Sequence, residues 1–138
     1  MMPTVQHETV ALALPWSDED EMVDIDAGIV PLIRALWIRR LPTVASCENQ
    51  AGYVHIAFAA WSGVTAFVEM AALGRRVEIV AELPDKPPPD GRWIVRRSDC
   101  SVRFPRKHLG RVTQAVWNAR ERSPAEQQPN ARRAPATA

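Results

Sequence analysis

The sequence LPTVASCENQAGYVHIAF, residues 41–58, contains residue types of a nucleophilic site. A catalytic cysteine reacts as its thiolate, so Cys47 would require a base, and His55 lies eight residues downstream. His55 alternates with Val54 and Ile56, however, which favours a position facing solvent or a helix edge. No family-specific cysteine signature surrounds Cys47, and free cysteine commonly packs as a small hydrophobic residue. We therefore expect Cys47 to pack in the core.

The alternative is a ligand-binding or enzymatic loop at this position. Its candidate residues are Ser46, Cys47, Glu48 and Asn49, with His55 assisting. The Cys47–His55 interval is repeated by Cys100 and His108, and two Cys with two His would satisfy tetrahedral zinc in number. Neither interval matches the spacing of closed zinc sites, so we expect no metal.

Acid–base catalysis by Asp24, Asp26 or Glu48 is the next possibility. The segment VDIDAG stands directly before a helical pattern, where acidic residues cap exposed N–H groups and complement the helix dipole. Capping explains these carboxylates better than catalysis. No GxxxxGK[ST], GxGxxG, HExxH or GxSxG motif occurs, so we expect no cofactor, and an enzyme is the less favoured class.

Basic residues are concentrated between positions 92 and 111, where seven of them accompany Asp99 alone. Trp93 and Phe104 are interleaved with them, a pattern typical of nucleic-acid or anion surfaces. The candidate contact residues are Arg96, Arg97, Arg103, Arg106, Lys107 and His108. Residues 1–26 carry seven acids and no Lys or Arg, so this acidic segment could shield the basic remainder of the chain.

The elements that position these residues follow from periodicity. Apolar residues at helical spacing predict a first helix ending near Leu41, before Pro42. Ser62 is a candidate N-cap and Gly74 a candidate C′ residue for a second helix, and Leu109, Val112 and Val116 mark a third. Strands are expected at residues 43–47, 53–59, 75–83, 92–97 and 100–104, with a stiff proline-rich loop at residues 84–91.

We summarise the order as α-β-β-α-β-β-α, two tandem α-β-β units with a closing helix. This order predicts a single α+β domain with a mostly antiparallel sheet covered by helices and with flexible termini. The expected boundaries are an acidic arm or added edge strand at 1–23, the domain at 24–122 and a disordered tail at 123–138. A length of 138 residues fits one domain, and two cysteines fit a reduced, cytoplasmic protein. The apolar stretches are far shorter than a membrane span, and no basic leader precedes them, so we expect no membrane partner.

Two resemblances add to these predictions. The pattern D-x-G-I, L-I-x-x-L-W, T-x-x-S-C and S-V-R-F-P-R resembles small phage and actinobacterial proteins without an established activity, which implies a shared fold. In this chain it comprises Asp26, Gly28, Ile29, Leu32, Ile33, Leu36, Trp37, Thr43, Ser46, Cys47 and residues 101–106. The segment with Thr43, Ser46 and Cys47 is also similar to the Ser-Cys loop of the tRNA wybutosine-synthesis methyltransferase family, although Glu48-Asn49 stands where that family has Ser-Gly.

The sequence therefore predicts a non-enzymatic binding or regulatory module, phage-related by resemblance. We expect it to act through a protein or nucleic-acid partner by way of its basic surface. The small-ligand or enzymatic loop around Cys47 is the alternative function.

Overall fold

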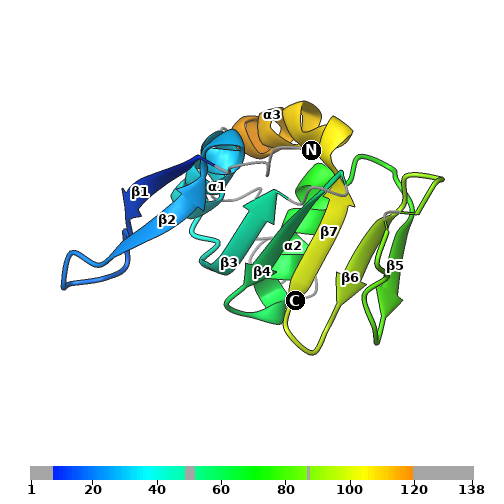
Figure 1. Cartoon of the computed structure of the whole chain (residues 1–138), viewed down its shortest axis with the longest axis horizontal. Helices are drawn as coiled ribbons and strands as arrows, with labels where there is room; N and C mark the ends of the chain where they lie inside the picture. Colours follow the sequence, from blue (N-terminus) through cyan, green and yellow to red (C-terminus); the bar gives the residue numbers. More distant parts are fainter. Residues whose placement is uncertain (1–7, 49–51, 87, 120–138) are drawn as a thin grey trace, which may run out of the picture.

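The computed structural model describes residues 8–48, 52–86 and 88–119, and these form an α+β domain. Its main sheet has five strands in the order β3-β4-β7-β6-β5, and a separate two-stranded sheet joins β1 to β2 (Figure 1). All pairings in the main sheet are antiparallel except β5 with β6. The predicted fold class, α+β with a mostly antiparallel sheet, is confirmed.

The acidic segment forms a β-hairpin of β1 (Thr9–Ala13) and β2 (Met22–Asp26). Its ladder is antiparallel, and its apolar residues Leu12 and Ile25 belong to the hydrophobic core. The hairpin therefore does not extend the main sheet as an added edge strand. The expected acidic arm at 1–23 thus falls largely on this hairpin, while its residues 1–7 and the expected tail at 123–138 lie outside the described residues.

Helix α1 (Val30–Ile38) follows a 3-10 turn at Ala27–Ile29 and carries Pro31 in its first turn, where a missing N–H costs least. Its periodic apolar residues Leu32, Ile33 and Leu36 are fully buried, as their spacing predicted. Asp26 occupies the N-cap position, but its side chain makes no capping bond there. Asp26 Oδ2 instead accepts a hydrogen bond from the backbone N–H of Glu48 at 2.8 Å, so the capping interpretation of Asp26 was wrong.

Strands β3 (Thr43–Glu48) and β4 (Tyr53–Phe58) lead to helix α2 (Trp61–Ala71). The cap of α2 is the extended residue Ala60 and not Ser62, which lies inside the first turn. Three strands follow: β5 (Val77–Val80), β6 (Trp93–Arg96) and β7 (Ser101–Pro105). The summary order was thus short by one strand in its second half. A 3-10 turn at Arg106–His108 then leads into helix α3 (Leu109–Ala119).

The helices cover one face of the main sheet, and an aromatic cluster fills the space between the two layers (Figure 1). Phe67 of α2 lies 5.3 Å from Phe58, 5.6 Å from Trp93 and 6.1 Å from Phe104, measured between ring centroids. Trp93 stacks on Phe104 at 4.8 Å. We call the opposite surface of the five-stranded sheet the open face, because no helix of the described residues covers it.

Candidate functional site

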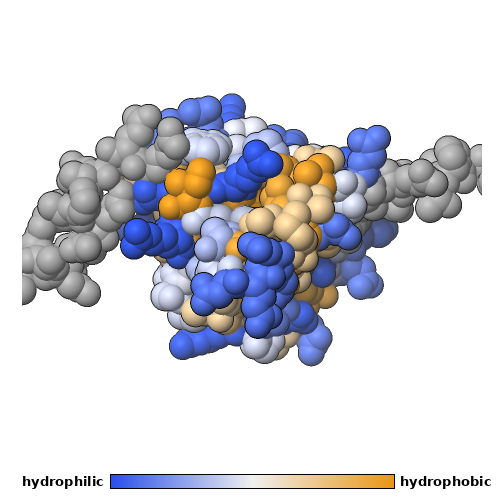
Figure 2. All heavy atoms as spheres, turned by 90° about the vertical axis from the view of Figure 1, so that its left-hand side faces the viewer, coloured by the Kyte–Doolittle hydropathy of each residue, from blue (hydrophilic) through white to orange (hydrophobic). Residues whose placement is uncertain are grey.

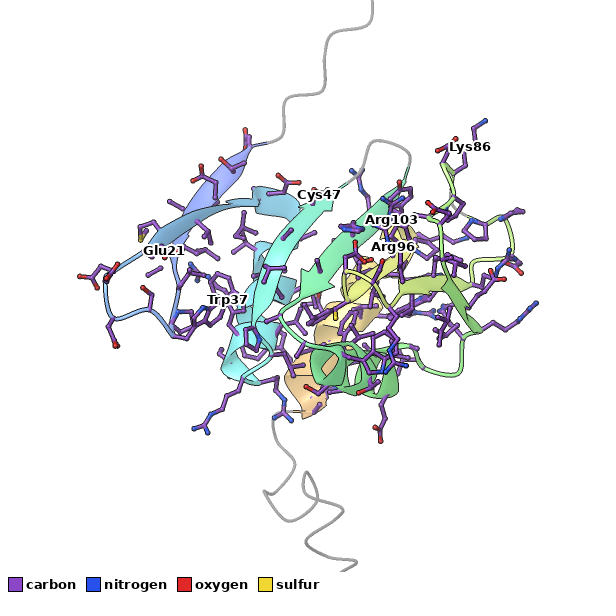
Figure 3. The ribbon with its side chains drawn as sticks, turned by 90° about the horizontal axis from the view of Figure 1, so that it is seen from below. Glu21, Trp37, Cys47, Lys86, Arg96 and Arg103 are labelled. Atoms are coloured by element: carbon purple, nitrogen blue, oxygen red, sulfur yellow. The ribbon has the colours of Figure 1, made fainter. Side chains whose placement is uncertain are left out.

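The open face collects polar side chains from strands that are far apart in the sequence. Val54, Ile56 and Val102 are buried on the helix side, so the residues alternating with them point to the open face. The strand register places Cys47, His55, Arg103 and Ile94 side by side in one row across four strands. Figure 3 shows Cys47, Arg103 and Arg96 on this part of the sheet.

Arg103 is fixed at the centre of the open face by three neighbours. Its Nε donates a hydrogen bond to His55 Nδ1 at 3.0 Å, and its Nη1 donates to the hydroxyl of Tyr53 and, at 3.4 Å, to the carbonyl of Pro84. The guanidinium carbon also lies 4.6 Å above the Tyr53 ring, a cation–π geometry. Within the described chain, no carboxylate pairs with Arg103. Its positive charge is therefore held in place without being neutralised.

His55 is a neutral hydrogen-bonding group in this arrangement. Burial, and next the charge of Arg103, lower the pKa of His55 below its ordinary value of 6.5. Because Nδ1 accepts the bond from Arg103, the ring proton of neutral His55 is carried by Nε2. His55 thus adds an N–H donor beside the guanidinium and has no free Nδ1 to act as a base.

Cys47 is exposed and is the register partner of His55, so the expectation that it packs in the core was wrong. The strand alternation that buries Ser46 and Glu48 toward the helix side turns Cys47 to the open face. Partial desolvation, and next the Asp26 carboxylate, raise the pKa of the Cys47 thiol. At neutral pH this group is a thiol, which is the unreactive form.

The predicted loop of four residues does not form one cluster. Ser46 Oγ is buried and has no hydrogen-bond partner among the described residues. Glu48 forms an ion pair with Arg106, with Glu48 Oε1 3.2 Å from Arg106 Nε. The Glu48 carboxylate packs so closely on Gly28 that a Cβ atom there would clash with it. Glu48 therefore has a structural role, because it links β3 to Arg106 and packs on Gly28. Its side chain lies on the opposite face of the strand from Cys47. Asn49 lies outside the described residues.

The six predicted basic contact residues are dispersed over the molecule. Arg96 and Arg103 share the open face, whereas Arg97 lies over the Trp61 ring at 5.0 Å and Arg106 pairs with Glu48. Lys107 is exposed at the 3-10 turn before α3.

His108 is buried beside Gly91, and burial together with neighbouring cations lowers its pKa. It is therefore not a surface contact. Only two of the six basic candidates thus lie together on the open face.

Tyr53 and the proline-rich loop were missed as parts of this site. The loop connects β5 to β6, and its Pro84, Lys86 and Pro88 line the same small hollow as Tyr53 and Arg103. Alternation placed Tyr53 on the same face as His55 and was the available signal for it. The loop gave no such signal, because its path depends on the parallel pairing of β5 with β6.

Arg96 is neutralised by its neighbour in the turn that follows β6. Its Nη2 lies 2.6 Å from Asp99 Oδ2 and its Nε 3.2 Å from Oδ1, while Ser101 Oγ donates to Oδ1 at 2.6 Å. The hydrogen bonds from Arg96 are the main cause that lowers the pKa of Asp99 to about 2. Of these two arginines, Arg103 and not Arg96 therefore lacks a carboxylate partner among the described residues.

We expect Asp99 to make stability fall with acid below about pH 4. A carboxyl whose folded pKa is depressed stabilises the fold above its unfolded pKa of 3.8, and that contribution is lost as pH falls to about 2. More than a third of the Asp99 side chain is exposed, so solvent screening limits the effect to about 1 kcal/mol. Urea unfolding of the wild type and of Asp99→Asn should therefore differ most at pH 5 and converge toward pH 2. The exposed Asp85→Asn is the control, and an Asp99→Asn difference that does not change with pH would contradict the assignment.

Among the described residues, no group of three or more His, Cys, Asp or Glu side chains is placed to hold a metal ion. The hollow beside Arg103 and Tyr53 has a volume of about 10 Å³, so the loop and strand side chains fill it. None of the helices in the described part of the chain has the length and apolar character required to cross a membrane. No family model, curated protein or solved structure matches the chain.

Proposed function

We propose that this protein is a non-enzymatic binding module whose open face binds a nucleic-acid strand. The observation that carries the proposal is the guanidinium of Arg103, which pairs with no carboxylate of the described residues and is held between His55 and Tyr53 on the open sheet surface. A phosphate group is the natural complement of a fixed guanidinium whose Nη2 donates to no described residue, and His55 Nε2–H offers a second donor beside it. The relation to phage and actinobacterial proteins that the sequence pattern indicates stays a prediction.

The shape of the open face favours an extended ligand over a small molecule. Ala45 and Ala57 occupy the row next to Cys47 and His55, so the surface there is low and flat. Lys86 is exposed on the loop at the far side of Arg103, and Figure 3 places it at the end of that loop. A strand of nucleic acid lying along this surface would contact both Arg103 and Lys86.

The chemistry of the same residues speaks against a nucleophilic enzyme. The pKa of the Cys47 thiol is raised, and the Nδ1 atom of His55 already accepts a hydrogen bond. An activated cysteine requires the opposite, a depressed thiol pKa and an available base. We therefore prefer binding to catalysis for this surface.

Fluorescence anisotropy with a labelled single-stranded oligonucleotide of about 12 nucleotides tests the proposal. We expect an affinity that falls steeply with salt, because bound cations release counterions from the strand. Arg103→Ala should weaken binding about tenfold at low salt and reduce the salt slope by about 1. The matched control is Arg34→Ala, which removes an exposed arginine from α1 on the helical side. Absence of binding at low salt, or an equal loss in both variants, would rule out the open face as the binding surface.

A further inference from the structure

A second surface lies between the acidic hairpin and the edge of the main sheet. Strands β2 and β3 run side by side in the same direction (Figure 1) and are tied at their ends by the Glu48 N–H to Asp26 hydrogen bond. Among the strands of the described residues, β2 pairs only with β1, and β3 only with β4. Each strand therefore has one backbone edge without a ladder partner, and such edges are templates for an added strand.

Between these two strands the molecule is hollowed. The groove has a volume of about 440 Å³, and its lining includes residues 23–25 of β2 and residues 43–46 of β3. Trp16 and Trp37, which meet edge to face at 5.3 Å, form an apolar wall at one end. Val44 is 69% exposed here, so its side chain is available for an apolar contact. The groove thus combines free backbone edges with apolar side-chain contacts.

The rim of the groove is strongly acidic. Figure 2 shows apolar residues gathered between hydrophilic ones on this side of the molecule, and Figure 3 places Glu21 at the far end of the hairpin. Glu21 and Asp24 line the groove directly. None of the hairpin carboxylates at positions 18–21 and 24 forms an ion pair with another described residue. These unmatched negative charges define the chemistry of what can bind.

We propose that this groove binds an extended, basic peptide segment of a partner protein. The segment adds to the free edge of β3 by backbone hydrogen bonds, the mode known as β-augmentation. Its alternate apolar side chains contact Val44 and the Trp16–Trp37 pair, and its Lys or Arg side chains meet Glu21 and Asp24 on the rim. This interaction is separate from the proposed nucleic-acid surface and does not depend on it.

Charge favours a basic peptide over two other possible occupants of the groove, nucleic acid and a second copy of this chain. Nucleic acid is repelled by the acidic rim. A second copy of this chain, paired through the same β3 edge, would bring two acidic hairpins together, which like-charge repulsion opposes. A cationic peptide strand can form backbone hydrogen bonds with β3, apolar contacts with the Trp16–Trp37 pair and ion pairs with the carboxylates of the rim at the same time.

The probe is a labelled seven-residue peptide of alternating lysine and valine, measured by fluorescence anisotropy against the full chain. We expect it to bind, and we expect the counterpart with glutamate in place of lysine not to bind. A lysine–valine peptide with N-methyl groups on alternate amides keeps every charge but loses the hydrogen bonds of one edge, so it should bind at least about tenfold more weakly. Equal binding of the methylated and unmethylated peptides would overturn β-augmentation.

Two variants locate the site on the protein. Glu21→Lys combined with Asp24→Lys changes only side chains that form no ion pair with another described residue, and it should weaken peptide binding about tenfold at low salt. Glu69→Lys, an exposed charge reversal on α2, should leave the affinity unchanged. Val44→Pro falls in the β3 bulge between Thr43 and Ala45, where proline is tolerated, and should also weaken binding. A dimer of the free protein that Val44→Pro dissociates would assign the edge to a second copy and overturn the proposal.

Discussion

Replacement of Phe67 by alanine is expected to lower the free energy of unfolding by about 3–5 kcal/mol. The Phe67 ring is fully buried and contacts the rings of Phe58, Trp93 and Phe104. It therefore joins α2 to the three inner strands of the sheet, β4, β7 and β6. Alanine would leave a cavity surrounded by rigid aromatic rings, and such walls relax poorly. A native domain is stabilised by only about 5–15 kcal/mol, so the variant should be partly unfolded at modest denaturant concentrations.

Urea unfolding followed by tryptophan fluorescence measures this loss, because Trp93 lies within the same cluster. Glu69→Ala is the control on the same helix: its side chain is exposed, so its unfolding free energy should change by no more than about 0.5 kcal/mol. A Phe67→Ala protein with wild-type stability would mean that α2 does not pack on the sheet through this ring.

The part of the fold that sequence predicted correctly is the part encoded by local periodicity. The spacing of Leu32, Ile33 and Leu36 defined the buried face of α1 before any tertiary contact was known, because 3.6-residue periodicity places these side chains on one stripe. The alternation of Val54, Ile56 and Phe58 identified the face of β4 that packs toward the helices in the same way, although Tyr53 and Ala57 on the other face are also buried. Both patterns depend only on neighbours within about two helical turns or a few strand residues.

The arrangement of the site depends on contacts that local patterns do not contain. Arg103 and His55 are 48 residues apart, and they meet only because β7 lies beside β4. The parallel pairing of β5 with β6 sends the proline-rich loop across the open face, where Pro84 reaches Arg103. For Cys47 the reasoning relied on residue type, since cysteine is usually buried, and the strand register overrode that tendency.

The charges of the molecule are unevenly distributed. Seven of its 16 Asp and Glu residues lie within residues 1–26, which carry no Lys or Arg, whereas Arg103 and Lys86 lie on the open face at the other side of β3 and β4 (Figure 3). The two proposed ligands match this distribution, an anionic strand at the open face and a cationic strand at the hairpin. The electrostatic fields of the two surfaces overlap at low ionic strength. We therefore expect each surface to lower the affinity of the other for its proposed ligand.

Neutralising the hairpin should therefore shift the two affinities in opposite directions. The change is the combined variant Asp18→Asn, Glu19→Gln, Asp20→Asn and Glu21→Gln. All four positions lie outside the core, and Asp20 has a positive φ of 54°, a conformation that asparagine adopts readily. At low salt we expect the oligonucleotide to bind about tenfold more tightly and the lysine–valine peptide about tenfold more weakly.

The oligonucleotide shift should disappear as salt is raised, because at about 0.1 M the Debye length is near 10 Å and charges on exposed hairpin residues no longer act across the sheet. The peptide shift should shrink but persist, because Glu21 lines the groove itself. Glu69→Gln on α2 removes a carboxylate outside the hairpin and should change neither affinity by more than about twofold. Weaker binding of both ligands would indicate that the hairpin acts through folding and not through charge, and circular dichroism of the variant would verify this. Tighter oligonucleotide binding with an unchanged peptide affinity would separate the two surfaces and leave the acidic rim without a role in peptide binding.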